Sequence, residues 1–77
     1  HNEYFLAELN DITRCNEFIA EIKSKYNVVE VRVTSAKSNL SGHISIQFVI
    51  GDLTGEMVEE IMQYNQREYI VYFVQSY

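Results

Sequence analysis

Hydrophobic and polar side chains alternate strictly along residues 29–34 of this 77-residue chain, and they alternate along residues 43–50 except at Val49. A period of two is typical of a strand that buries one side and exposes the other. In residues 29–34 we expect the valines to face the core. In residues 43–50 the expected inward side chains are those of Ile44, Ile46, Phe48 and Ile50.

The segment from residue 12 to 26 repeats apolar residues every three or four positions, which predicts an amphipathic helix. Asn10 or Asp11 is expected to cap its N-terminal end, where a carboxylate also suits the helix dipole. Lys23 and Lys25 suit the opposite end. The expected apolar stripe consists of Ile12, Cys15, Ile19, Ile22 and Tyr26, widened by Phe18.

A second helix is expected from Thr54, a good capping residue, to about Gln66. Two apolar runs, residues 4–9 and 69–74, are short and rich in aromatic side chains, so both predict strands. For residues 4–9 the alternative is a backward extension of the first helix, since most of these side chains favour helices. The apolar positions of the second helix are Met57, Val58, Ile61, Met62 and Tyr64.

These elements follow the order β-α-β-β-α-β. Two right-handed β-α-β halves would place four strands in one antiparallel sheet with both helices on one face. This is the ferredoxin-like plait of the α+β class, and it puts the first and third strands at the centre of the sheet. The polar segment from Ser35 to Gly42 predicts a hairpin loop between the second and third strands.

The composition agrees with a single folded domain over residues 1–77, since 47% of the residues are hydrophobic and 22% are charged. No apolar run approaches the ~20 residues that a membrane-spanning helix needs, so direct membrane insertion is not expected. The chain begins with His1, contains no proline and has no signal-peptide pattern. We therefore expect a trimmed piece of a longer protein, located in the cytoplasm, where the single Cys15 would stay reduced.

With both helices on one side of the sheet, the other side would lie uncovered; we call it the open sheet face. Exposed clusters of large apolar side chains often mark a protein-binding surface, although a partly wetted antiparallel sheet is the ordinary alternative. The expected partner interface consists of Tyr4, Leu6, Val49, Val71 and Phe73. The remaining open-face positions are expected to be Glu8, Glu30, Arg32, Thr34, Ser45, Gln47 and Tyr69, with Ile70 and Tyr72 as the alternative for the last strand.

Residues with catalytic or metal-binding potential are few and isolated. His43 stands alone at the start of the third expected strand, and Cys15 lies in the helix stripe, where a free cysteine packs as a small hydrophobe. No CxxC or HExxH spacing occurs, so neither a metal site nor a cofactor is expected. The net charge of −5 and the outward positions of the third strand argue against nucleic-acid binding.

The turn between the first strand and the first helix is the candidate ligand site, formed by Asn10, Asp11 and Thr13. Free N–H groups at a helix start can bind an anion such as an amino-acid carboxylate, and simple helix capping explains the same residues. A plait-fold hydrolase of the acylphosphatase type would need an arginine in an anion-binding loop here. Arg14 follows the helix start, and the loop holds no glycine, so we expect no enzyme.

The pattern resembles the ACT domain, a small regulatory plait, over nearly the whole chain. The likeness rests on the stripe of Ile12, Ile19 and Ile22, on residues 27–31 and 42–46 at the strand entries, and on Asp52 and Glu56 beside the second helix. This chain has Asn10, Asp11 and Ile12 where that family usually has a glycine in its ligand loop. A second likeness is to the ACT-like cytosolic tail domains of MgtC-type bacterial membrane proteins.

The resemblance implies a regulatory or assembly domain without catalysis of its own. ACT domains usually pair through sheets or edges and sense small ligands for an attached enzyme or regulator. We therefore expect a homodimer, or docking on an attached or separate partner protein, with a small-molecule effector as a further option. The alternatives are the cytosolic tail of a membrane protein, a stand-alone protein-binding factor and, less favoured, the acylphosphatase-like enzyme.

Overall fold

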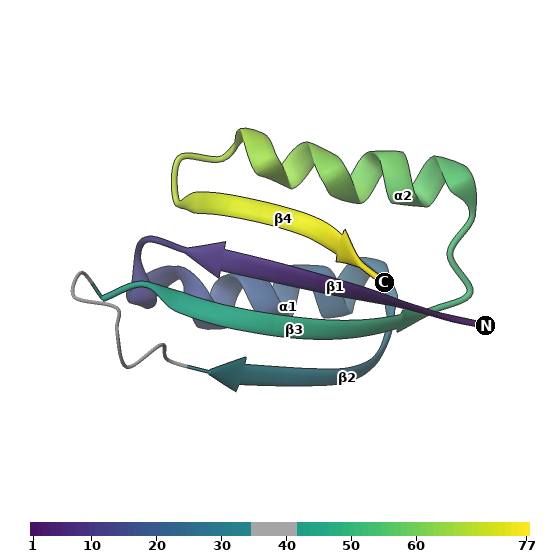
Figure 1. Ribbon diagram of the computed structural model, residues 1–77, viewed down its shortest axis with the longest axis horizontal. Coiled ribbons are helices and arrows are strands. Elements are labelled where there is room, and N and C mark those ends of the chain that lie inside the picture. The colour runs from purple at the N-terminus through teal and green to yellow at the C-terminus, as the bar shows by residue number, and fades with distance from the viewer. Residues whose placement is uncertain (35–41) are drawn as a thin grey trace.

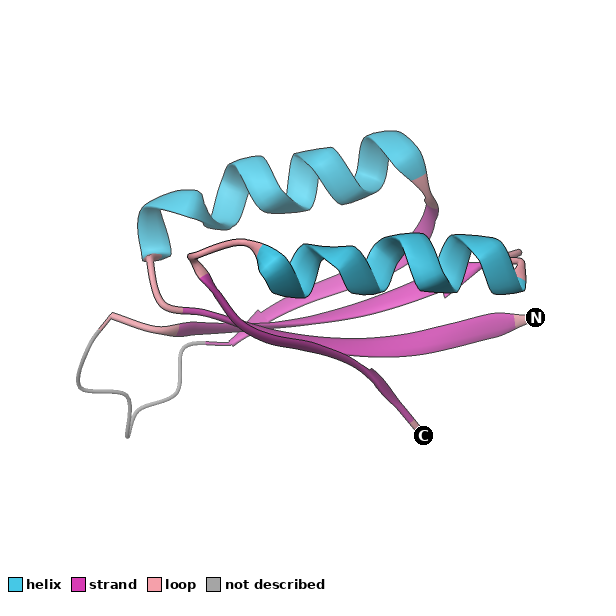
Figure 2. Cartoon of the chain, turned by 90° about the horizontal axis from the view of Figure 1, so that it is seen from above, coloured by secondary structure: helices cyan, strands magenta, loops and turns pink. Residues whose placement is uncertain are grey.

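The computed structural model describes residues 1–34 and 42–77. Its four strands form one antiparallel sheet in the order β2-β3-β1-β4 (Figure 1). Both helices lie on one face of this sheet, and the other face carries no described segment (Figure 2). The elements are β1 (Asn2–Leu9), the 3-10 turn η1 (Ile12–Arg14), α1 (Cys15–Lys25), β2 (Asn27–Thr34), β3 (Ile44–Gly51), α2 (Gly55–Met62), the 3-10 turn η2 (Gln63–Gln66) and β4 (Ile70–Ser76).

The expected α+β architecture is confirmed: the order of the elements and the layers are those of a ferredoxin-like plait. Residues 4–9 form a strand and do not extend the first helix. The first and third strands occupy the centre of the sheet, as the two right-handed crossovers require. Within the described ranges, no helix is both long enough and apolar enough to cross a membrane.

The core lies between the sheet and the two helices. On β3 the four expected inward side chains, from Ile44 to Ile50, are all buried, and on β1 the buried ones are Phe5, Ala7 and Leu9. Phe5 pairs with Phe48 and Ala7 pairs with Ile46 across the two strands. A period of two in both central strands therefore builds one continuous apolar surface under the helices.

Aromatic side chains hold α1 on this surface. The Phe18 ring lies edge-on to the rings of Phe48, Tyr64 and Phe73, with centroid separations of 5.8, 5.7 and 5.6 Å. Edge-to-face pairs of this kind contribute about 0.5–1.5 kcal/mol each beyond the apolar area they bury. One helix residue thus joins α1, η2, β3 and β4.

The first helix begins with a tighter turn than its periodicity predicts. Asp11 is the capping residue, since its carboxylate accepts the backbone N–H of Thr13 at 3.0 Å. Residues 12–14 then form the 3-10 turn η1 before α1 starts at Cys15. Because a 3-10 turn advances each side chain by a larger angle than an α-helix does, Ile12 leaves the buried stripe and is 55% exposed. The prediction that Ile12 belongs to the buried stripe is therefore wrong.

Strand β2 departs from the strict alternation that its sequence predicts. Val28 pairs with Ile50 and Glu30 pairs with Val49, so Val29 is an extra residue in the ladder. Val29 is 58% exposed, and Val33 is 44% exposed at the far end of the strand. The inward valines are Val28 and Val31, which pack against the core. A β-bulge at Val29 thus shifts the pattern by one residue.

Strand β4 contains a second bulge. Leu9 pairs with Ile70 and Glu8 pairs with Tyr72, which leaves Val71 without an opposite residue. Ile70 and Phe73 consequently both face the helices, although three positions separate them. Neither of the two alternations considered for the last strand describes it, because each assumed a regular period of two.

The expected hairpin loop from Ser35 to Gly42 lies outside the described residues except for its last position. Gly42 has φ +71°, a backbone conformation that glycine adopts without strain. Directly after β3, Asp52 has φ 58°, and its carboxylate accepts the side-chain amide of Asn27 at 3.2 Å.

Candidate functional site

The open sheet face is the side of the sheet without helices (Figure 2). Direct pairing places its side chains in rows across the strands: Glu30 beside Val49 and Tyr4, and Arg32 beside Gln47 and Leu6. The β4 positions that pair with these β1 residues also belong to the face. In full, the open sheet face consists of Tyr4, Leu6, Glu8, Glu30, Arg32, Thr34, Ser45, Gln47, Val49, Tyr72, Val74 and Ser76.

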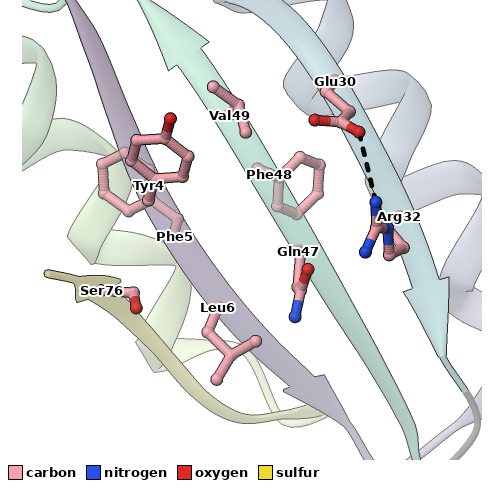
Figure 3. Close-up of a pocket in the computed structure, with 9 residues that line it drawn as sticks. All are labelled: Tyr4, Phe5, Leu6, Glu30, Arg32, Gln47, Phe48, Val49 and Ser76. Carbon is pink, nitrogen blue, oxygen red and sulfur yellow. Dashed lines mark ion pairs between the residues drawn. The ribbon is translucent and has the colours of Figure 1, made fainter.

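The centre of the open sheet face is apolar and slightly hollow. Tyr4 and Val49 pair directly, and Leu6 pairs with Val74, so four apolar side chains from three strands adjoin one another. A depression of about 270 Å³ lies between β1, β3 and β2, with Tyr4, Leu6 and Val49 on its lining (Figure 3). Tyr4 and Val74 are among the most exposed large hydrophobic residues of the described chain.

Charged and polar side chains border this apolar centre. On β2, the Arg32 guanidinium lies 3.7 Å from the Glu30 carboxylate, and both side chains are more than half exposed. At the end of the sheet near residue 42, the His43 ring nitrogen Nδ1 lies 2.8 Å from the Glu8 carboxylate. An apolar centre with a polar rim is the usual anatomy of a protein–protein interface.

Three of the five expected interface residues, Tyr4, Leu6 and Val49, lie together on the open sheet face. Val71 is exposed, but it occupies the β4 bulge and has no opposite residue in β1. Placing Phe73 on this face is wrong: its side chain is fully buried beneath the helices. Tyr72 and Val74 lie on the face instead, because the bulge at Val71 changes which β4 residues point outward. Residues 69–74 are apolar at every position, so their pattern does not indicate this bulge.

The turn after β1 brings together the three expected ligand-site residues, Asn10, Asp11 and Thr13. All three already form hydrogen bonds within the chain. The Asn10 side-chain amide donates to the Glu68 carbonyl at 3.1 Å. The Asp11 carboxylate accepts both the backbone N–H and the hydroxyl of Thr13, and these hydrogen bonds lower its pKa. These contacts cap the turn and attach it to the segment before β4.

A polar network that sequence reasoning missed lies on the helix side. The Arg67 guanidinium donates to both oxygens of the Glu21 carboxylate at 2.8 and 2.6 Å, and the Tyr64 hydroxyl donates to it at 2.7 Å. Arg67 also lies 4.3 Å from the centre of the Tyr64 ring. Hydrogen bonding from Arg67 lowers the pKa of Glu21 to about 2. Partners 46 residues apart leave no periodic signal in a sequence.

A second depression, of about 220 Å³, borders this network. Its lining includes Tyr26, whose hydroxyl donates to the Glu60 carboxylate, and Tyr64 and Arg67, which are bonded to Glu21. These polar groups already contact one another. The depression is therefore the surface of a structural network that joins α1, α2 and η2.

The remaining candidates for chemistry are separate from one another. Burial raises the pKa of the Cys15 thiol, which is the opposite of what an activated nucleophile requires. Among the residues that the structure describes, no three His, Cys, Asp or Glu side chains gather in a way that could hold a metal ion. His43 contacts Glu8 at the rim of the open sheet face.

No protein-family model matches this sequence, and no curated protein matches it. The likeness to the ACT domain therefore stays a prediction. The fold stands independently on the strand order and on the position of the helices.

Proposed function

We propose that the chain is a non-catalytic regulatory or assembly domain that associates with a second copy through its open sheet face. The observation that supports this is the group of apolar side chains on the uncovered side of the sheet: Tyr4, Leu6, Val49 and Val74. Bringing two such faces together removes apolar surface from water, which is the main driving force of association.

The size of the face limits how much surface this association can bury. Four strands of seven or eight residues, spaced about 4.8 Å apart and rising about 3.3 Å per residue, cover roughly 500 Å². Stable complexes bury about 800 Å² on each partner. A single open sheet face therefore supports weak, reversible pairing, suited to a domain whose association is regulated.

The test is an NMR dilution series from about 1 mM to about 10 µM, a range that brackets weak binding. Amide signals of Tyr4, Val49 and Val74 should move with concentration in the wild type and stay fixed in Leu6→Glu, because a carboxylate at the centre would be desolvated on pairing. Ala20→Glu, which adds the same charge on the exposed side of α1, should behave as the wild type. Concentration-independent open-face signals in the wild type, or equal movement in Leu6→Glu, would contradict the proposal.

A further inference from the structure

Strand β4 forms one of the two edges of the sheet. It pairs with β1 on one side, and no described strand pairs with its outer side (Figure 1). The outward backbone N–H and C=O groups of such an edge are a template on which another strand can pair. Proteins usually protect their edges with charged residues, proline or a covering segment. β4 contains no charged residue and no proline, and Val71 and Val74 are exposed on it.

The composition of β4 favours pairing with further strands. Its residues 70–76 combine β-branched and aromatic side chains with the absence of charge, proline and glycine. This is the composition of segments that add readily to copies of themselves. The other edge strand, β2, carries Glu30 and Arg32. β4 therefore needs a protection other than charged side chains of its own.

The side chain of Asn65, in η2, binds the outer edge of β4 at the middle of the strand. Its carbonyl oxygen accepts the backbone N–H of Phe73 at 2.7 Å, and its amide nitrogen donates to the Phe73 carbonyl, also at 2.7 Å. In an antiparallel ladder the N–H and C=O of one residue point to the same side of the strand. Both backbone groups of Phe73 therefore point away from β1 and are occupied by Asn65.

These two hydrogen bonds replace those that a residue of a neighbouring strand would form. An asparagine side chain ends in a donor and an acceptor, as a backbone peptide does, so it can exchange both bonds with one strand residue. The same amide nitrogen also donates to the Met62 carbonyl at 3.2 Å, at the end of α2. The adjacent Tyr64 is buried in the core. The fold itself thus holds the Asn65 amide against the edge.

We propose that Asn65 closes the β4 edge to strand addition, because its amide occupies the backbone groups on which a second copy of this edge would pair. An incoming strand has to displace both hydrogen bonds before it can bind at Phe73. Phe73 is the middle residue of β4, so a strand excluded there keeps only short pairing on either side. This closure concerns the edge alone and does not depend on the face contact proposed above.

The first test is hydrogen exchange at low concentration in the Leu6→Glu chain, which lacks the face contact. Outward amides alternate along a strand, so the next one after Phe73 is that of Gln75. The Phe73 amide should exchange about tenfold or more slowly than the Gln75 amide, and Asn65→Ala should remove most of this difference. Equal exchange of the two amides with Asn65 in place, or an unchanged Phe73 rate in Asn65→Ala, would overturn the proposal.

The second test is sedimentation velocity in the same background from about 10 µM to about 1 mM. Asn65→Ala should form larger species than the Leu6→Glu chain, and its β4 amides should exchange more slowly as these species form. Adding Val74→Lys, a charge on the edge strand, should restore the background size.

The matched control is Gln66→Ala, which removes an amide of the same turn that bonds to Gln63 and not to β4. This variant should sediment as the background does. An Asn65→Ala chain of background size, or larger species without slower exchange at β4, would contradict closure of the edge by Asn65. Both tests read the edge in a chain without the face contact, so their outcome is separate from that of the dilution series.

Discussion

Glu21 shows how a single residue acquires a role that its neighbours in sequence do not specify. Lys25, four residues further along α1, makes only a long contact of 3.6 Å with the Glu21 carboxylate. The closer partner is Arg67, which donates to both carboxylate oxygens and comes from the segment between η2 and β4. Glu21 therefore attaches α1 to the second half of the chain.

The lowered pKa of Glu21 makes this attachment dependent on pH. The pKa of this carboxyl group is about 2 in the folded chain, whereas a glutamate without such partners has a pKa of 4.5. A carboxylate with a depressed folded pKa contributes stability that is present above its unfolded pKa and is lost as the pH falls through the folded value.

We therefore expect Glu21→Gln to lower the free energy of unfolding at pH 7 by roughly 1–2 kcal/mol, a range reduced for partial exposure of the pair. The difference from the wild type should shrink between about pH 5 and about pH 2, since the wild-type carboxyl becomes neutral there. Urea unfolding at a series of pH values measures this, with exposed Glu17→Gln as the matched control. A difference that does not change with pH would show that Glu21 acts by packing alone.

Among the secondary-structure elements, capping was predictable and bulges were not. Thr54 and one of the two residues Asn10 and Asp11 were expected to cap helices. Asp11 and Thr54 both accept backbone N–H groups of the following turn. Capping depends on residues three positions apart or fewer, so a sequence records it. The bulges at Val29 and Val71 depend instead on which residues of a neighbouring strand lie opposite.

The Thr54 cap should contribute measurably to the second helix. Its hydroxyl accepts the Met57 N–H at 3.2 Å, and removing it leaves a helix N–H without a partner in the chain. Thr54→Ala should lower the free energy of unfolding by about 1 kcal/mol, whereas Thr54→Ser, which keeps the oxygen, should restore most of it. Equal loss in both variants of a thermal or urea unfolding series would assign the effect to the missing methyl group.

For the whole molecule, small size links stability to association. A chain of 77 residues has little core to offset the entropy of ordering, so any contact that removes apolar surface matters. Four strands also leave one face and two edges of the sheet without a partner strand among the described residues. The proposed association uses the open sheet face, a surface that the fold itself does not cover.

Association that involves only the folded chain should raise its melting temperature with concentration. Over a hundredfold increase in wild-type concentration we expect a rise of a few degrees, since small domains change by about 4–8 °C per kcal/mol. The rise should be smaller in Leu6→Glu and equal to that of the wild type in Ala20→Glu, as measured by circular dichroism. Equal melting temperatures at both concentrations in the wild type would contradict association through the open sheet face.

The sequence alone predicted the order of the elements and the inward side chains of the two central strands, with a helix extension left open for residues 4–9. It also predicted the cap at Thr54 and reduced the first cap to Asn10 or Asp11. These follow from periodicity, from local hydrogen bonds and from the handedness of β-α-β connections, all of which act over short distances or by general rule. They were sufficient to place Tyr4, Leu6 and Val49 on one face.

Only the tertiary structure decided the rest. Phe73 lies in the core and Val74 on the open sheet face because the Val71 bulge changes the register of β4 against β1. Arg67 reaches Glu21 because the sheet brings residues 46 positions apart into contact. Register and long-range contacts depend on how whole elements pack, and no local pattern of hydrophobic and polar residues carries that information.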